Sequence, residues 1–371
     1  MLFDPNPKSR REDLFGRDEE INMFTESLEL GERLIVVYGV RRVGKTSFIR
    51  VALRELKYPH VIIDVREIYN TYGRVTKYHL YSKMAEYFTR NLDFFGKMGF
   101  KLRELLRRIR GFRVTELGVD IEPVSLPSIT SLLRRYDEWA SKHNTRFVIA
   151  FDEAQYLRFS GVTRYDGIFA WAVDNLENLT IVVTGSEIGI LQDFLRLDDP
   201  KAPLFGRYAR EIKLERFTRT QSIEFLKKGF SELNIAIDEN ELHEVTSRLD
   251  GIPGWLTLYG YYRGVEKRSH IDALEKVFEV GSKLTMEELE KIVAPSRERY
   301  LTILEAITRG ASTWREIKTY VMYKTGPITD KRFTDLLKKL VKYSIIEKRD
   351  NQYKIADPLI EYSIKIMISH T

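Results

Sequence analysis

The chain has 371 residues, of which 43% are hydrophobic and 31% are charged, and it contains no cysteine. This length exceeds one small core, so we expect roughly two or three domains, and the apolar content argues against disorder. The lack of cysteine excludes disulfides, thiol catalysis and cysteine-ligated zinc. No stretch reaches about 18 apolar residues, and the first residues lack the apolar core of a signal peptide. We therefore expect a cytoplasmic protein that does not enter a membrane.

The positive charge lies toward the carboxyl-terminal end. The formal net charge is +6, and residues 297–371 hold 15 Lys and Arg against 9 Asp and Glu. The rest of the chain is therefore neutral overall, and attraction to a polyanion is expected in this last segment. Abundant Lys, Arg, Glu, Ile and Tyr without cysteine is also typical of a thermophile protein.

Short apolar runs alternate with helical patterns between about residues 33 and 215. The runs predicted as strands are 34–38, 61–65, 147–151, 180–184 and 211–214. The first four are apolar and rich in β-branched residues, as in strands buried on both faces of a parallel sheet. The helical stretches between them suit crossover connections. We therefore expect a five-stranded α/β core over residues 1–216.

The connection between the second and third strands is too long for one crossover helix. We expect helices at 77–92 and 101–110, followed by a hairpin over 112–122. A basic run lies here, made of Lys101, Arg103, Arg107, Arg108, Arg110 and Arg113. It is either a solvated helix face or a contact for nucleic acid or a protein partner.

Two further domains are expected after the core. Residues 217–294 show helical patterns without a strand signal, which predicts a small helical lid. In residues 295–371 we expect three helices and a two-stranded hairpin, at 299–308, 313–323, 331–343 and 344–356. The second of these helices opens with a capping box of Thr313 and Glu316. Three helices followed by a two-stranded wing is the winged-helix pattern.

The strongest motif is the run from Gly39 to Thr46, which matches G-x-x-x-x-G-K-[ST] between a predicted strand and a predicted helix. Its two glycines permit a tight loop whose backbone N–H groups surround phosphates. Lys45 places a cation on the outer phosphates, and the Thr46 hydroxyl ligates Mg²⁺. The helix that starts here adds its positive dipole end. The expected contacts with ATP are Gly39, Val40, Arg41, Arg42, Val43, Gly44, Lys45, Thr46 and Ser47.

A second motif, FDEAQ at 151–155, ends a buried strand with Asp152 and Glu153. Asp152 is expected to hold Mg²⁺ through water. Glu153 is expected to act as the general base that polarises the attacking water, and a helix-capping carboxylate is the alternative. The pair favours an ATPase over a kinase, because hydrolysis needs a positioned water.

Polar side chains near the ends of later strands are candidates for contact with the γ-phosphate. In TGSE at 184–187 the hydroxyls of Thr184 and Ser186 follow a strand, and we favour Ser186. Arg207, in LFGR at 204–207, precedes the last strand and could reach a phosphate in trans, which requires a homo-oligomer. A structural ion pair is the alternative for Arg207.

Two motifs that flank the core are candidates for the adenine site. FGRDEE at 15–20 contains Phe15 and Arg17 and could close over the base. GIPGW at 251–255 lies in the predicted lid, where Pro253 makes a rigid turn that could also meet the base. A plain turn between helices is the alternative for this second motif.

Taken in order, these six motifs resemble those of the archaeal AAA+-related ATPases of the STAND class, over residues 10–365. The resemblance implies a five-stranded parallel P-loop NTPase (AAA+-like) core, a helical lid and a carboxyl-terminal winged helix. It also implies that ATP binds with Mg²⁺ between core and lid, and that the nucleotide state is coupled to domain arrangement. The implied roles are phosphate and metal binding for Lys45 and Thr46, metal binding for Asp152, and water activation for Glu153. Arg207 matches the candidate arginine finger and Pro253 the lid proline near the base.

Three functions compete. The first is an ATPase whose winged helix contacts double-stranded DNA, and the second is an ATP-dependent signalling switch whose winged helix binds protein. The third is a nucleotide-binding structural module without turnover, against which Lys45, Asp152 and Glu153 argue. The third helix and the wing of the winged helix carry Lys331, Arg332, Lys338, Lys339, Lys342, Lys348 and Arg349. Because such a face suits phosphate contacts, we expect the first function.

Overall fold

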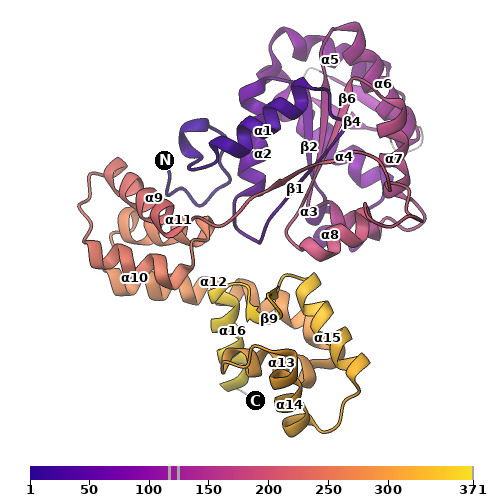
Figure 1. The fold of residues 1–371 in the computed structure, drawn as a ribbon. Helices are drawn as coiled ribbons and strands as arrows, with labels where there is room; N and C mark the ends of the chain where they lie inside the picture. The colour runs from indigo at the N-terminus through magenta and orange to yellow at the C-terminus, as the bar shows by residue number, and fades with distance from the viewer. Residues whose placement is uncertain (116–117, 123–125, 370–371) are drawn as a thin grey trace.

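The computed structural model describes residues 1–115, 118–122 and 126–369. Figure 1 shows a part built around a sheet, a small helical part, and a carboxyl-terminal part that lies below both in this view. Among the described residues, no helix combines the length and the apolar character that a membrane span needs.

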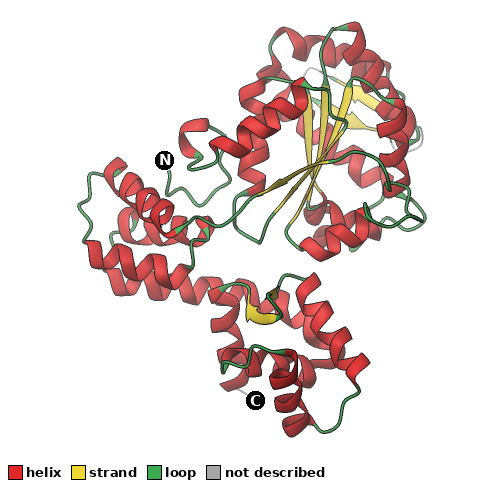
Figure 2. Ribbon diagram, viewed as in Figure 1, coloured by secondary structure: helices red, strands yellow, loops and turns green. Residues whose placement is uncertain are grey.

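The sheet of the first part has five parallel strands, which confirms the predicted fold class (Figure 2). Its strands in spatial order are β2 (His60–Asp64), β5 (Phe147–Asp152), β6 (Leu179–Gly185), β1 (Leu34–Tyr38) and β7 (Arg210–Lys213). Every residue of β5 and β6 is buried, as the continuous apolar runs indicate. Because the strands are parallel, their carboxyl ends meet at one edge of the sheet, where Asp152 and Thr184 come to lie on neighbouring strands.

Helices cover both faces of this sheet. They are α1 (Asp18–Glu29), α2 (Lys45–Leu56), α3 (Val65–Tyr72), α4 (Lys77–Asn91), α6 (Ile129–Lys142), α7 (Tyr165–Asn175) and α8 (Ile188–Leu195). Strand β1 alternates between the faces: Ile35 packs with α1 and α2, whereas Leu34 packs with the apolar cluster that contains α4, α6 and α7. The sheet is therefore the middle layer of a three-layer core.

The long connection after β2 contains the predicted helix and hairpin. Helix α5 (Lys97–Arg108) begins four residues before the predicted start at 101, directly after Gly96, which has a φ of +54°. The hairpin is formed by β3 (Phe112–Val114) and β4 (Val119–Ile121), and residues 116–117 between them lie outside the described residues.

The helical lid is formed by α9 (Arg219–Glu232), α10 (Glu239–Leu249), α11 (Pro253–Gly260) and α12 (His270–Val293). Its core also contains Leu2 and Phe3, although the sequence predicts residues 1–216 as the ATPase core. The Phe3 ring makes edge contacts with Phe225 and Phe230, so the amino-terminal segment packs into the lid.

The carboxyl-terminal part has the predicted winged-helix order. It contains α13 (Arg297–Thr308), α14 (Trp314–Thr325), α15 (Asp330–Lys342), β8 (Ile346–Arg349) and β9 (Gln352–Ile355). Both halves of the Thr313–Glu316 capping box are formed. A final helix, α16 (Pro358–Ser369), was not predicted and packs against α12 and α13. Residues 370–371 lie outside the described residues.

Candidate ATP site

The loop between β1 and α2 needs both of its glycines, for different reasons. Gly44 has a φ of +98°, a left-handed conformation that side chains disfavour. At Gly39 a Cβ atom would lie 2.4 Å from the carbonyl oxygen of Leu214, so the backbone there must pass close to the end of β7. The loop thus takes the tight path that places backbone N–H groups around a phosphate.

Lys45 is buried at the start of α2. Its Nζ donates to the carbonyl oxygens of Gly39 and Val40, at 2.9 and 3.1 Å. Burial lowers the pKa of Lys45, and the carboxylates of Glu153 and Asp152 oppose that effect. The ammonium group is thus held within the loop, where phosphate oxygens can replace the two carbonyl acceptors.

Asp152 is hydrogen-bonded by two hydroxyls. Thr46 Oγ1 donates to Asp152 Oδ2 at 2.6 Å, and Thr184 Oγ1 donates to the other oxygen, Oδ1. Burial raises the pKa of Asp152, as does the neighbouring Glu153, whereas the two hydroxyls oppose the rise. The paired oxygens of Thr46 and Asp152 are ligands of the type that Mg²⁺ prefers.

No group of three or more His, Asp or Glu side chains that could hold a metal occurs in the described part of the chain. A magnesium ion at Thr46 and Asp152 would need waters and nucleotide phosphates as its remaining ligands, as is usual for this ion. The oxygen pair next to the phosphate loop fits that arrangement.

Glu153 lies in a left-handed conformation, with a φ of +53°. Its Oε2 accepts from Gln155 Nε2 at 2.7 Å and from Ser186 Oγ at 2.8 Å. It precedes a 3-10 helix (Ala154–Phe159), but its side chain makes no capping hydrogen bond there. The capping alternative is thus absent from this arrangement, and backbone strain at this point is typical of a functional residue.

The two candidate hydroxyls, those of Ser186 and Thr184, donate hydrogen bonds to different carboxylates. Ser186 donates to Glu153 through both Oγ and its backbone N–H, the latter at 3.1 Å. Thr184 donates to Asp152 and accepts from the backbone N–H of Glu153 at 2.9 Å. Burial alone would raise the pKa of Glu153, but Lys45, Gln155 and Ser186 outweigh it and lower that pKa. The site therefore favours an ionised Glu153.

The candidate adenine residues line one cavity. A space of about 220 Å³ beside the loop is bounded by Phe15, Arg17, Ser47 and Pro253 among others. Arg17 is buried and fixed, because it pairs with Glu20 at 2.8 Å and donates to the carbonyl oxygens of Val43 and Glu215. Residues from the segment before α1, from the phosphate loop and from the lid thus meet where a base could bind.

The GIPGW turn of the lid is docked on the phosphate loop. The Gly254 N–H donates to the carbonyl oxygen of Arg42 at 2.9 Å, and the Arg42 guanidinium lies 4.0 Å from the centre of a Trp255 ring. Burial lowers the pKa of Arg42 to about 10. The Trp255 indole in turn donates to Asp357, which precedes α16, at 2.9 Å. These contacts join loop, lid and winged helix.

Arg207 lies in an ion pair within this chain. Its guanidinium donates to the Asp174 carboxylate at 2.8 and 2.6 Å and to the carbonyl oxygen of Pro203. The structural ion pair, which is the alternative role for Arg207, is thus present in this chain. A role in trans would require Arg207 to leave Asp174.

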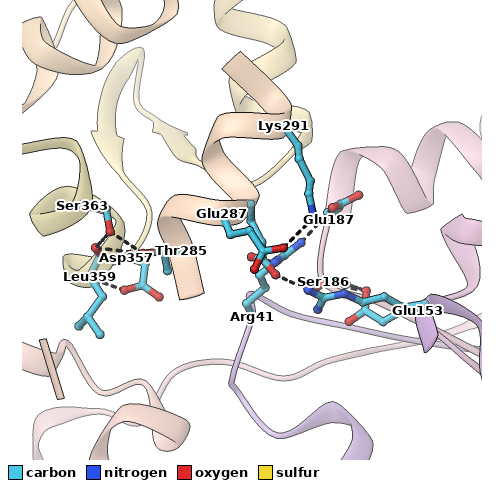
Figure 3. A network of polar contacts seen from close by, with 12 residues as sticks. Arg41, Glu153, Ser186, Glu187, Thr285, Glu287, Lys291, Asp357, Leu359 and Ser363 are labelled. Carbon is cyan, nitrogen blue, oxygen red and sulfur yellow. Dashed lines mark hydrogen bonds and ion pairs between the residues drawn. The ribbon is translucent and has the colours of Figure 1, made fainter. Parts of the chain in front are cut away.

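Sequence reasoning missed a group of charged residues around Arg41. This loop arginine donates to Glu187 at 3.1 Å (Figure 3). It also pairs with Glu288 of α12, which pairs in turn with Arg66 of α3. The loop motif leaves positions 41 and 42 unspecified, so it gives no signal for the partners of the two arginines. Their partners come from distant segments, and no local pattern identifies them.

Residues 14–258 match the family described as an ATPase domain predominantly from Archaea. Residues 295–356 match the carboxyl-terminal winged helix-turn-helix domain of MCM proteins. The solved Walker-type ATPase of Pyrococcus abyssi is 38% identical, with a TM-score of 0.82 over 98% of this chain and 100% of that chain.

Two more distant matches were found. The Aeropyrum pernix ORC2 protein, solved as ADPNP and ADP complexes, has a TM-score of 0.58 at 12% identity over 100% of this chain and 97% of that one, which shows a shared fold alone. An uncharacterized protein of Methanocaldococcus jannaschii is 24% identical over 342 residues, or 90% of this chain. The chain spans 62% of the length of that relative.

Proposed function

We propose that this chain, which belongs to the ATPase-domain family found predominantly in Archaea, hydrolyses ATP with Mg²⁺ to change its domain arrangement. One observation carries the proposal. A cavity of about 330 Å³ is lined by Lys45, Thr46 and Glu153 of the core, and also by Thr285 of α12 and Asp357 beside the winged helix. A nucleotide held there would touch the catalytic groups, the lid and the segment beside the winged helix at once.

Each catalytic group has a role that its contacts support. Glu153, ionised and oriented by Ser186 and Gln155, takes a proton from the attacking water. Lys45 stabilises charge on the outer phosphate oxygens. Thr46 and Asp152 would hold Mg²⁺, which supplies further neutralisation of the phosphates when bound.

The experiment is phosphate release from ATP by the full chain, with Mg²⁺ and with a chelator. Lys45→Ala should lose nucleotide binding. Glu153→Gln should keep binding but hydrolyse about 100-fold more slowly, because an amide cannot accept the proton. Glu104→Gln, on the exposed face of α5, is the matched control. Wild-type turnover by Glu153→Gln would refute the assignment of the base.

We propose further that the winged helix contacts duplex DNA. The match to the MCM winged helix and the exposed Lys331, Arg332 and Lys338 of α15 support this role. A titration of duplex DNA with and without ATP tests it: binding that weakens steeply with added salt is expected.

A second function is favoured by a specific observation, the docking of the winged helix on the core. Lys342 of α15 pairs with Asp193 of α8 at 2.6 Å, and Arg216 pairs with Glu347 of β8. A winged helix held in this way suits an ATP-dependent switch of the STAND class that releases a protein-binding surface. No DNA binding at low salt in either nucleotide state would favour this function.

The composition supports, as a further part of the proposal, a cytoplasmic protein of a thermophile.

A further inference from the structure

Four cations line the proposed phosphate cavity: Lys45 at the start of α2, Arg41 and Arg42 from the phosphate loop, and Arg66 from α3. Arg42 lies over the Trp255 ring, which leaves Lys45, Arg41 and Arg66. Their charges act on Lys45: burial lowers the pKa of Lys45, and the positive charges of Arg41 and Arg66 lower it further. Although the carboxylates of Glu153 and Asp357 also line the cavity, Arg41 and Arg66 together present two guanidinium groups that suit one anion.

A carboxylate of the lid occupies this space. Glu288 of α12 lines the same cavity, and its two oxygens are divided between the two arginines, Oε1 on Arg66 and Oε2 on Arg41. The three side chains are between 23 and 33% exposed, so these ion pairs are partly shielded from water. Both arginines are thus bridged by one anion, as guanidinium groups often bridge the oxygens of a phosphate.

Arg41 is held from two sides. Its other contact is Glu187, which follows the strand that carries Thr184, and Figure 3 shows Arg41 between α12 and this loop. Glu187 Oε2 is buried and has no hydrogen-bond partner among the described residues. Glu187 therefore keeps Arg41 directed into the cavity when the contact with Glu288 is lost.

We propose that Arg41 and Arg66 bind the outermost phosphate of ATP, and that Glu288 occupies their site in this conformation. The inference rests on the proposed function, since it requires ATP at Lys45 and Thr46. ATP must then displace Glu288, because two anions cannot share the two arginines without strong repulsion. Because Glu288 lies on the long helix α12, its displacement moves the element that joins lid and winged helix.

The same arrangement predicts selectivity between nucleotides. ADP lacks the phosphate that would compete with Glu288, so it can bind at Lys45 while the ion pairs with Arg41 and Arg66 remain. ATP binding must break them. Removal of the charge of Glu288 should therefore favour ATP over ADP.

The experiment measures the affinity of the full chain for fluorescent ATP and ADP analogues. Glu288→Gln removes the charge at nearly constant shape and should tighten ATP binding on the order of tenfold, with little effect on ADP. Arg66→Ala should weaken ATP binding more than ADP binding, and Arg66→Lys should restore part of the loss.

The matched control is Glu287→Gln, one position earlier on α12. Glu287 is 73% exposed and pairs with Lys291 at 3.1 Å (Figure 3). Its replacement therefore removes the same charge without breaking the ion pairs of Glu288. Equal ATP affinities of Glu288→Gln and Glu287→Gln, in a wild-type protein that binds ATP, would overturn this inference alone. A wild-type protein that does not bind ATP would overturn the proposed function as well.

Discussion

At the scale of single residues, the sequence predicts the phosphate loop and the acidic pair because each is a motif of adjacent residues. A glycine with a φ of +98° and a lysine beside it are dictated by a local motif. The partners of Arg41 were not predictable. Glu187 and Glu288 are separated from Arg41 by 146 and 247 positions, and only the fold brings them together. The sequence indicates the motifs for nucleotide binding and hydrolysis, and the fold determines which charged side chains pair with Arg41.

Arg207 provides a prediction at this scale, because its two roles make opposite demands on Asp174. If Arg207 acts in trans, Arg207→Ala should lower ATP hydrolysis about 1,000-fold or more with unchanged ATP affinity, since the arginine acts in the transition state. Asp174→Asn, which removes the ion-pair partner of Arg207, should then hydrolyse ATP at the wild-type rate. Mixing Arg207→Ala with Lys45→Ala protein should restore part of the activity, because one interface again holds both intact halves.

Phosphate-release assays and denaturation midpoints of the variants distinguish the roles. A purely structural ion pair predicts that Arg207→Ala and Asp174→Asn lower stability and turnover alike, and that mixing restores nothing at any concentration. That result would remove Arg207 from the catalytic site.

At the scale of elements, apolar periodicity located the strands, and polar capping groups set the ends that it missed. We predicted β2 as 61–65, but Asp64 accepts a hydrogen bond from the Glu67 N–H and so starts α3 one residue earlier. We predicted no helix after the wing, but helix α16 forms there and packs against α12 and α13. Two signals are present: helical spacing of its buried residues, and Asp357-Pro358, a capping carboxylate followed by a first-turn proline.

Strand β2 contains a buried histidine that makes stability depend on pH. His60 is 1% exposed, and burial lowers its pKa to about 4, while a 2.6 Å contact with the Tyr58 carbonyl opposes that shift. An unfolded histidine takes up a proton below about pH 6.5, whereas folded His60 stays neutral until about pH 4. The unfolded state therefore binds more protons in this window, and stability falls as the pH is lowered through it.

Denaturant unfolding at several pH values measures this effect. At pH 5 the loss due to His60 should be about 2 kcal/mol relative to pH 7. His60→Asn should be less stable at pH 7 but should lose less stability between pH 7 and pH 5 than the wild-type protein. His243→Asn, on the exposed surface of α10, is the control and should keep the wild-type slope. An unchanged slope in His60→Asn would show that another group accounts for the pH dependence.

At the scale of the whole molecule, the position of the winged helix could not be predicted from the sequence, because it depends on contacts between domains. Helix α15 meets α8 so closely that a Cβ atom on Gly189 would lie 2.7 Å from the Lys342 backbone. Lys342 pairs with Asp193, and Lys339 lies over the Tyr300 ring. Part of the basic face expected to contact DNA is therefore already engaged within the chain.

This engagement sharpens the last prediction, which concerns DNA. Lys331, Arg332 and Lys338 are exposed, so replacing all three with Glu should weaken duplex binding across all sequences and reduce the salt dependence, since each neutralised phosphate releases counterions. The packing of α15 should survive, because its buried stripe from Phe333 to Leu340 is unchanged. Fluorescence anisotropy at several salt concentrations measures the binding. The control replaces Lys227, Lys283 and Lys365, at least half exposed on other helices, with Glu. If both triple variants lose binding equally, the effect is one of net charge, and α15 is not the DNA site.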